Sequence, residues 1–384
     1  MSIIFQDKSN NDIDALVSLC NESKGDLNSC VLTTTPFDDI KDENIFDDDK
    51  FIEEVEDGPF NTPPDILAYP FTIPQTIIKD LIISIDSGIV HLGKLYGGGI
   101  AFAIRGASVC NSNGEMLVLR YHTGPLLITS QNKGKVFRFI GSRLGNPDLY
   151  VKNINGQLIP NPGVLDTVNE MQDRCRSYIE RVIQEEALAV LSANHGGILL
   201  LDGALTISFD TPGNYLKALL QTASNNNVDV CAVSKRSRIT IGGTPIDSLF
   251  DQYPKFVGYA KLLDALKKER AAYQTNNMRS PGEITAGHEV FAVRFGFMPP
   301  GVTFRVDVFR SLGHTTDDVI NEVHNKCLIY GGYPRPLIDA HQYSCFQSSD
   351  KLSLLSEIAV QTGLRVKEEP SLEILFKPFG AFGK

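Results

Sequence analysis

Two short apolar runs in this chain each end on a single aspartate. They are LIISID, Leu81–Asp86, and ILLLD, Ile198–Asp202. Apolar runs of this length predict buried β-strands, and a carboxylate at the end of such a strand lies at the edge of the sheet where open α/β folds bind their ligands. Carboxylates are hard oxygen ligands that suit Mg²⁺ or Mn²⁺. For each aspartate alone, the alternative is a cap of a helix or turn.

Two divalent ions held a few ångströms apart can activate water and stabilise the leaving oxygen of a phosphodiester. A third ligand is available from the helix expected over 164–194, which carries Glu185 and Glu186. At about 100° per residue, Glu186 lies in the middle of the apolar stripe and Glu185 at its edge. A glutamate facing a core is costly unless it is paired or ligating. The alternative is an ordinary Glu-Glu step, and the choice between the two residues stays open.

A basic cluster follows another apolar strand, in AVSKRSR: Lys235, Arg236 and Arg238. Such side chains beside a carboxylate centre suit a phosphate backbone; the alternative is a surface turn. The segment Tyr333–His341 adds a phenol and an imidazole. His341 could protonate a leaving group or hold the scissile phosphate, whereas the other six histidines are interpreted as structural.

One motif resembles a phosphate-binding loop but lacks its essential features. GIVHLGKL, Gly88–Leu95, nearly matches the phosphate-binding loop G-x-x-x-x-G-K-[ST]. However, Leu95 has no hydroxyl for Mg²⁺, and a strand rather than a helix is expected to follow, although the helix N-terminus is the part that binds phosphate. The sequence therefore argues against a nucleotide-hydrolysing ATPase.

The elements that position these residues follow from hydrophobic periodicity. Strands are expected at 81–86, 99–108, 116–122, 198–202 and 228–233, with helices at 164–194 and 214–223 between the later ones. Three strands with short links predict an antiparallel meander, and a strand reached through a helix can pair parallel to it. Further expectations are helices at 11–22, 255–273, 316–327 and 350–362, a hairpin of 290–297 with 303–309, and a last strand at 372–376.

The composition indicates a protein of a reducing cytoplasm. The chain has 384 residues and is 42% hydrophobic. It has no run near the roughly 18 apolar residues that a membrane helix needs, and its first residues lack the pattern of a secretory signal. Its seven cysteines are scattered and never form a C-x-x-C pair, which argues against disulfides and zinc.

The charge is unevenly distributed. The net charge is −10, yet residues 1–60 hold 16 acidic and 4 basic side chains, so the remainder carries a net +2. Most of the acid lies in Asp38–Gly58, which is expected to be solvated and partly disordered. The alternative is an acidic arm that docks on a basic partner or shields a DNA groove. Residues 1–76, which end in a proline-rich connector, are thus expected to precede a main domain of residues 77–384.

The blocks IISIDSG, GGGIAFAIRGASV, ILLLDGAL, AVSKRSR and YPRPLIDAH together resemble the NurA family of prokaryotic nucleases, in order and in approximate spacing. The resemblance covers about Ile82 to Leu355. It implies an α/β fold: a ribonuclease H-like core with a mixed, mostly five-stranded sheet flanked by helices, plus helical additions. The first and fourth strands of such a sheet carry carboxylates.

The resemblance also implies Mn²⁺- or Mg²⁺-dependent cleavage of DNA, with 5′→3′ exonuclease and single-strand endonuclease activity. The implied partners are a second copy of the chain and a hexameric HerA-type DNA-translocating ATPase, in DNA end resection or phage defence. Residue by residue, Asp86 and Asp202 match the strand aspartates, and Glu185 or Glu186 matches the helix glutamate. Tyr333 and His341 match the late tyrosine and histidine. The first motif departs from the family, because it has Asp-Ser-Gly in place of the usual Asp-Gly-Ser.

The sequence thus predicts a metal-dependent DNA nuclease of one or two ions, without a membrane segment. Two other functions stay open. The chain could be a catalytically weak dimeric scaffold or regulator of an ATPase ring, or a ribonuclease H-like enzyme that acts on RNA or hybrids.

Overall fold

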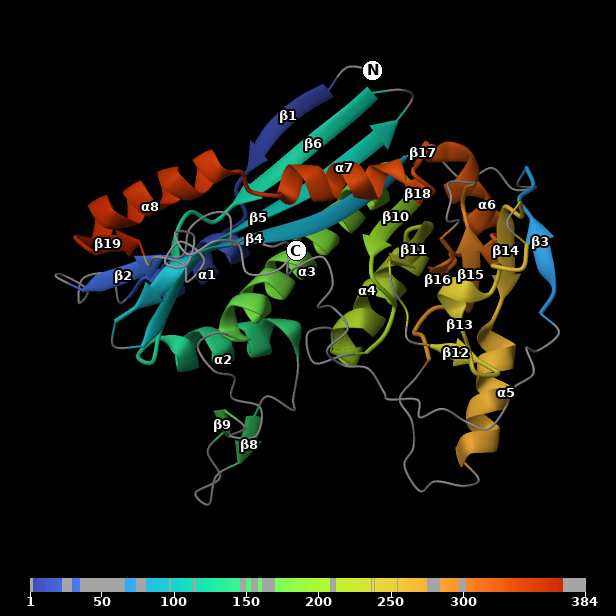
Figure 1. Ribbon diagram of the computed structural model, residues 1–384, viewed down its shortest axis with the longest axis horizontal. Helices are drawn as coiled ribbons and strands as arrows, with labels where there is room; N and C mark the ends of the chain where they lie inside the picture. The colour runs from blue at the N-terminus through green and yellow to red at the C-terminus, as the bar shows by residue number, and fades with distance from the viewer. Residues whose placement is uncertain are drawn as a thin grey trace, which may run out of the picture.

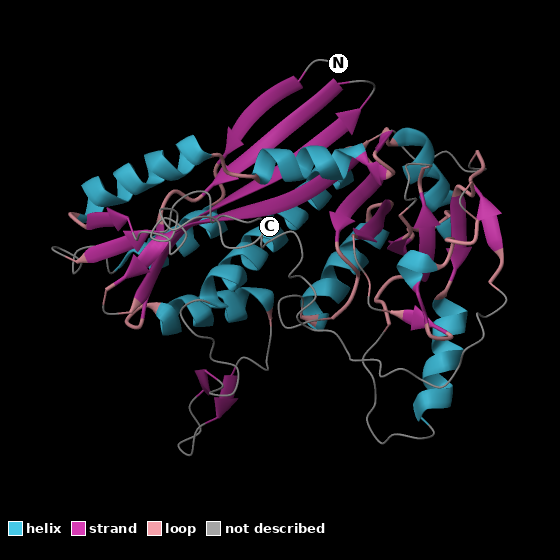
Figure 2. Ribbon diagram, viewed as in Figure 1, coloured by secondary structure: helices cyan, strands magenta, loops and turns pink. Residues whose placement is uncertain are grey.

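The computed structural model has a mixed α/β fold built on one large sheet (Figure 1). It describes residues 3–22, 30–34, 66–73, 81–96, 98–112, 115–145, 150–152, 158–160, 170–207, 212–235, 237, 239–253, 255–274, 284–296 and 302–368. Within these residues the sheet has 13 strands, more than the five expected, because further strands extend a central group on both sides. Figure 2 shows helices against both faces of this sheet.

The central strands run in the order β6-β5-β4-β10-β11. The first three form an antiparallel meander, and β10 and β11 then pair parallel to β4. Their bounds are β4 (Ile82–Leu95), β5 (Gly99–Ser112), β6 (Glu115–His122), β10 (Gly197–Asp202) and β11 (Val228–Ser234). The expected meander and the parallel fourth strand are therefore confirmed.

Strand β4 is longer than expected. Gly88–Leu95, which resembled a phosphate-binding loop, continues the strand and pairs with β5. Successive side chains of a strand point to opposite faces. Ile83 and Ile85 accordingly join the apolar core with α3, whereas Ser84 faces α7, where its hydroxyl donates to the carbonyl of Pro336 at 2.6 Å.

Two groups of helices cover the two faces (Figure 1). One face carries α1 (Asn11–Asn21), α2 (Lys133–Leu144), α3 (Glu170–Ala193) and α4 (Gly213–Asn225), and the other carries α7 (Arg335–Ser344) and α8 (Ser348–Thr362). Helix α1 begins at a capping side chain, since Asn10 Oδ1 accepts the backbone N–H groups of Asp12 and Ile13. The part of the expected long helix before residue 170 lies outside the described residues.

Strands from the N-terminal residues join the same sheet. Strand β1 (Ile3–Lys8) pairs parallel to β6, β2 (Val31–Thr34) pairs with β4, and β3 (Ala68–Pro70) pairs with β14 (Gly258–Lys261). The boundary expected at residue 76 is therefore not a boundary of the sheet. The acidic tract lies outside the described residues.

The C-terminal half completes the sheet. Strands β15 (Glu289–Arg294) and β16 (Phe304–Phe309) form the expected antiparallel hairpin, and β16 pairs with β11. The helix expected over 255–273 was placed too early, because Gly258–Lys261 pairs as β14 and α5 spans Leu263–Gln274. The remaining elements are β7 (Leu126–Thr129), α6 (Thr316–Lys326), β19 (Arg365–Glu368) and the short pairs β8–β9 (Tyr150–Lys152, Leu158–Pro160), β12–β13 (Thr240–Ile241, Thr244–Pro245) and β17–β18 (Ile329–Tyr330, Tyr333–Pro334). The strand expected at 372–376 lies outside the described residues.

No helix in the described ranges is long and apolar enough to cross a membrane. Helix α7 lies tightly against the sheet at Gly88. A Cβ atom added there would lie 2.4 Å from the backbone oxygen of Ser344. A glycine at this place therefore lets the end of α7 lie directly on β4, beside Asp86.

This contact yields a stability test. Gly88→Ala should lower the free energy of unfolding by about 1–3 kcal/mol, because the new methyl group overpacks against the α7 backbone. The measurement is urea unfolding followed by circular dichroism. Gly134→Ala in α2 is the matched control. No atom lies within 4 Å of its added Cβ, so the better helix propensity of alanine should raise stability by up to about 1 kcal/mol. Equal effects at the two glycines would contradict the packing argument.

Candidate functional site

The pairing of β10 with β4 brings Asp86 and Asp202 together. In this parallel register Leu200 is opposite Ser84 and Leu201 is opposite Ile85; the two aspartates come one step later. Adjacent strands are about 4.8 Å apart. Paired residues share a face, and Ile82, Ile198 and Leu200 lie in one apolar cluster on that face. The two carboxylates therefore lie side by side on the α7 face, where β10 ends.

Each carboxylate contacts a cationic or ionisable side chain. Lys235 Nζ lies 2.6 Å from Asp202 Oδ2, and His341 Nδ1 lies 2.8 Å from Asp86 Oδ2. The backbone N–H of Ser87 donates to Asp86 Oδ1 at 2.7 Å. Asp86 and Asp202 retain side-chain exposures of 12% and 23%, so the pair is shielded yet open to solvent on one side.

Tyr333 supports Asp202. Its hydroxyl donates to Asp202 Oδ1 at 3.3 Å, with the Val233 carbonyl 3.4 Å away. Burial, with the nearby charge of Asp202, holds the pKa of the Tyr333 phenol well above its ordinary value. The Tyr333 hydroxyl therefore remains a proton donor at neutral pH. The Tyr333 ring also lies 5.8 Å from Lys235 Nζ.

His341 is held on both ring nitrogens. Nδ1 contacts Asp86, and Nε2 lies 3.5 Å from the Sγ of Cys345. The hydrogen bond to Asp86 raises the pKa of His341 to about 10, with a further contribution from Cys345 and against the opposing effect of burial. The imidazole is thus protonated at neutral pH and can donate from both nitrogens.

Helix α7 positions His341, and sequence reasoning missed this helix within the segment Tyr333–His341. Prolines at 334 and 336 flank its start, and proline suits the first turn of a helix because that N–H has no intrahelical partner. The buried positions Leu337, Ala340 and Ser344 have the spacing of one helical face. The prolines and the apolar spacing together predict this helix.

The helix glutamates are placed differently from the expectation. The phenol of Tyr121 donates to Glu186 Oε2 at 2.6 Å, and Glu186 also accepts from the side chain of Asn10. Tyr121 is opposite Gly106, which is opposite Ser87. Glu186 is thus bound two strands away from β4, roughly 10 Å across the sheet, and Glu185 is exposed.

A different glutamate of α3 contacts β4. The hydroxyl of Ser87 donates to Glu180 Oε2 at 2.8 Å, and the Glu180 side chain is 15% exposed. Ser87 points to the α3 face, so Glu180 approaches β4 from the face opposite Asp86. Sequence reasoning did not single out Glu180. Ser87, directly after Asp86, is the residue that binds it.

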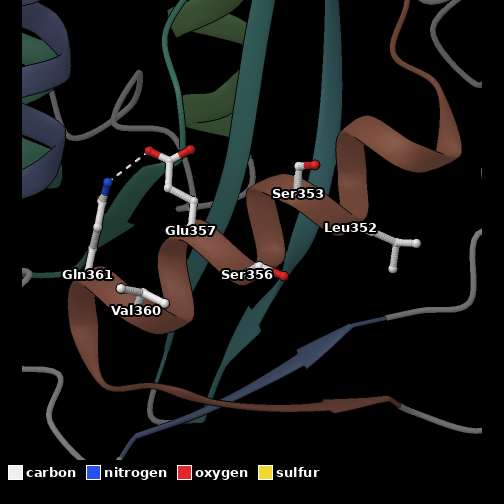
Figure 3. Close-up of a pocket in the computed structure, with 6 residues that line it drawn as sticks. All are labelled: Leu352, Ser353, Ser356, Glu357, Val360 and Gln361. Carbon is white, nitrogen blue, oxygen red and sulfur yellow. Dashed lines mark hydrogen bonds between the residues drawn. The ribbon is translucent and has the colours of Figure 1, made fainter.

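The basic cluster is described only in part. Lys235 contacts Asp202, whereas Arg236 and Arg238 lie outside the described residues. A shallow depression on α8 is separate from the carboxylate pair (Figure 3). It is lined by Leu352, Ser353, Ser356, Glu357, Val360 and Gln361. It shares no residue with the site described above.

The oxygen atoms of the carboxylate pair suit a divalent ion. Asp86 and Asp202 supply oxygen ligands from neighbouring strands, and Mg²⁺ is commonly bound by one or two carboxylates together with water and substrate phosphates. The two residues therefore fit Mn²⁺ or Mg²⁺. In the described part of the chain, no group of three or more histidine, cysteine, aspartate or glutamate side chains could enclose an ion by itself.

The position of Glu186 yields a second stability test. Glu186→Ala should lower the free energy of unfolding by about 1–3 kcal/mol, because the buried Tyr121 hydroxyl loses its acceptor. Glu185→Ala, one residue away on the exposed side, should change it by less than about 0.5 kcal/mol. Chemical denaturation of both variants checks this, and a neutral Glu186→Ala would contradict the assigned hydrogen bonds.

Solved structures of NurA proteins are similar to this chain. The chain resembles the NurA nuclease from Sulfolobus solfataricus with 15% identity and a TM-score of 0.44, over 77% of this chain and 86% of that one. It resembles NurA with manganese at 11% identity and a TM-score of 0.32, over 75% and 90%. It resembles NurA bound to dAMP and manganese at 11% identity and a TM-score of 0.32, over 73% and 88%.

No curated protein matches the chain. The NurA domain matches residues 80–344, which is more than half of the 384 residues and includes both aspartates, Lys235, Tyr333 and His341. The chain therefore belongs to the NurA family.

Proposed function

We propose that this protein is a divalent-metal-dependent DNA nuclease that hydrolyses phosphodiesters. The observation that carries the proposal is the pair Asp86 and Asp202 on the same face of adjacent parallel strands. Membership of the NurA family supports it. Carboxylates at such a strand edge are a common arrangement for metal-assisted phosphodiester hydrolysis.

We propose a ribonuclease H-like core for the centre of the sheet. The order β6-β5-β4-β10-β11 supports this, with three antiparallel strands followed by two parallel ones. Counted along the chain, Asp86 lies on the first strand of this core (β4) and Asp202 on the fourth (β10), as the resemblance to the family implies.

Asp86 and Asp202 would hold Mn²⁺ or Mg²⁺, as one or two ions. A bound ion would supply Lewis-acid chemistry for attack on the phosphodiester. Lys235 lies close enough to Asp202 to neutralise a phosphate oxygen bound beside it. Tyr333 orients Asp202 through its hydroxyl, and we propose that Arg236 and Arg238 extend the phosphate-binding surface.

His341 is the proposed proton donor. Asp86 fixes its Nδ1, so the ring orientation is set by a carboxylate on the strand beneath it. The proton on Nε2 would serve the leaving oxygen once Nε2 gives up its 3.5 Å contact with the Sγ of Cys345, and general acids of this kind contribute about 10²–10⁴-fold in rate.

We propose Glu180, rather than Glu185 or Glu186, as the helix glutamate of the site. Its hydrogen bond to Ser87 supports this, since that bond places it against β4 where β10 ends. Glu186 instead has partners on β6 and before α1.

The finer functional details are also proposals. They are 5′→3′ exonuclease and single-strand endonuclease activity, a homodimer, and work in the cytoplasm with a HerA-type hexameric ATPase in DNA end processing or phage defence. They rest on the family resemblance.

A catalytically weak scaffold of an ATPase ring is the second candidate. One observation favours it: Asp202 contacts the Lys235 amine and Asp86 contacts the protonated His341, so both negative charges are compensated without an ion. Incubation with labelled DNA and Mn²⁺, alone and with the ATPase, separates the two, because a scaffold cleaves in neither condition. Cleavage of RNA and of RNA–DNA hybrids, measured in parallel with DNA, distinguishes a ribonuclease from a DNA nuclease.

Asp202→Asn should abolish Mn²⁺-dependent degradation of labelled DNA, because the amide removes the negative charge that binds the ion. A loss of at least about 10³-fold is expected for a group this close to the reacting phosphate. Asp247→Asn, at an exposed aspartate, is the control and should be fully active. Full activity of Asp202→Asn with an unchanged unfolding curve would overturn the assignment.

Glu180 and Glu186 of α3 form a matched pair of test positions. Glu180→Gln should lower the rate of DNA cleavage at least about tenfold, because it removes one negative charge in contact with Ser87, the residue after the proposed metal ligand Asp86. Glu186→Gln should retain activity at temperatures where it is folded, since its carboxylate contacts β6. The measurement is the cleavage rate of each variant below its unfolding transition. Loss of activity in Glu186→Gln, with full activity in Glu180→Gln, would make Glu186 the functional glutamate.

A further inference from the structure

A tight hairpin stands beside the carboxylate pair. Its strands β17 and β18 are joined by Gly331 and Gly332, whose φ angles are +61° and +81°. Positive φ at both central residues is typical of the two-residue type I′ turn, which matches the twist of the flanking strands. The hairpin is thus a defined structure rather than a loose loop.

The hairpin is fixed against the body of the protein. A Cβ added to Gly296, just after β15, would lie 3.4 Å from Gly332 Cα and 3.6 Å from Ile329 Cγ2. The backbone N–H of Arg335 donates to the carbonyl of Leu328 at 2.8 Å. The backbone of the hairpin is therefore held at a set position relative to the sheet.

Tyr330 is directly opposite Tyr333 in this hairpin. Opposite residues project to the same face, and their Cα atoms are about 5 Å apart. Because the Tyr333 hydroxyl donates to Asp202, Tyr330 is only one cross-strand step from the group that contacts the carboxylate.

The two tyrosines differ sharply in burial. Tyr333 is 8% exposed, whereas Tyr330 is 67% exposed. Tyr330 therefore contributes little to the core, although its backbone is paired with that of Tyr333. It presents a large aromatic face to solvent, and the Lys235 amine lies 5.8 Å from the ring of its cross-strand partner Tyr333.

An aromatic face beside a cation is the combination that binds single-stranded nucleic acid, because bases stack on the ring while the cation neutralises the backbone. We propose that Tyr330 stacks on a nucleobase of single-stranded DNA adjacent to the site formed by Asp86, Asp202 and Lys235. This rests on the proposed nuclease function and specifies how its substrate is held. Since every base has an aromatic face, the contact is tolerant of sequence.

The test measures binding rather than cleavage. Full-length protein without metal is titrated into a single-stranded oligonucleotide that carries 2-aminopurine near one end, and fluorescence quenching reports stacking. Tyr330→Ala should weaken binding about 5- to 150-fold, the equivalent of losing one stacked base, and should abolish the quenching. Tyr330→Trp should retain both. Tyr96→Ala, at a tyrosine 87% exposed after β4, is the control and should bind like the unchanged protein.

An abasic nucleotide supplies a second measurement. Placed at the stacked position, it should weaken binding of the unchanged protein but should not weaken binding of Tyr330→Ala further. Equal binding by Tyr330→Ala and the unchanged protein would overturn the proposal. So would a variant that binds DNA normally but no longer associates with the ATPase, because the exposed ring would then serve a protein partner.

The results for the Tyr330 stacking contact and for the nuclease activity can be distinguished. Tyr330-dependent quenching without any Mn²⁺-dependent cleavage would reject the nuclease and keep the stacking contact. Cleavage that survives Tyr330→Ala with unchanged DNA binding would keep the nuclease and reject the stacking contact.

Discussion

The parallel pairing of β10 with β4 is the constraint on which the proposed site depends. It aligns Leu201 with Ile85, so the next residue of each strand is an aspartate on the same face. A shift of one residue in this register would turn one carboxylate toward the opposite face of the sheet. The apolar side chains of both strands oppose such a shift, because they fill the cores on the two sides.

The end of β10 is as important as its register. Gly203, with a φ of +110°, turns the chain away directly after Asp202. The following loop is held by buried Asp307, whose Oδ2 accepts the backbone N–H of Leu205 at 2.9 Å and which is paired with Arg305 at 2.8 Å. Strand β4 meanwhile continues, and α7 lies on it at Gly88. The carboxylates thus lie in a notch between a strand that ends and a strand that continues.

Local sequence patterns predicted the strands and helices whose formation depends on the burial of neighbouring side chains. The apolar runs before Asp86 and Asp202 form strands because each is buried on both faces, and α1 follows its apolar spacing. The partners of Glu186 could not be predicted, for a different reason. Helical periodicity indicates the face on which a residue lies, but it does not indicate which strand the helix crosses at that turn. Ile183 packs over Gly106 on β5, so Glu180 reaches β4 and Glu186 reaches β6.

Long-range pairing accounts for the other differences. Strands β1 and β3 join the sheet at partners more than 100 residues away in the chain, and a short strand at a sheet edge carries little local signal. Helix α7 begins between prolines that sequence patterns associate with extended chain. In the structure they begin the helix that brings His341 onto Asp86.

The central claim is that Asp86 and Asp202 bind one metal centre together. The most direct measurement is anomalous X-ray scattering at the manganese edge from crystals of the full chain soaked in Mn²⁺. The account predicts a peak within about 2.5 Å of a carboxylate oxygen from both residues, the usual range for oxygen ligands of divalent ions. A fully occupied manganese peak elsewhere, with the contacts of Asp202 to Lys235 and of Asp86 to His341 unchanged, would contradict it.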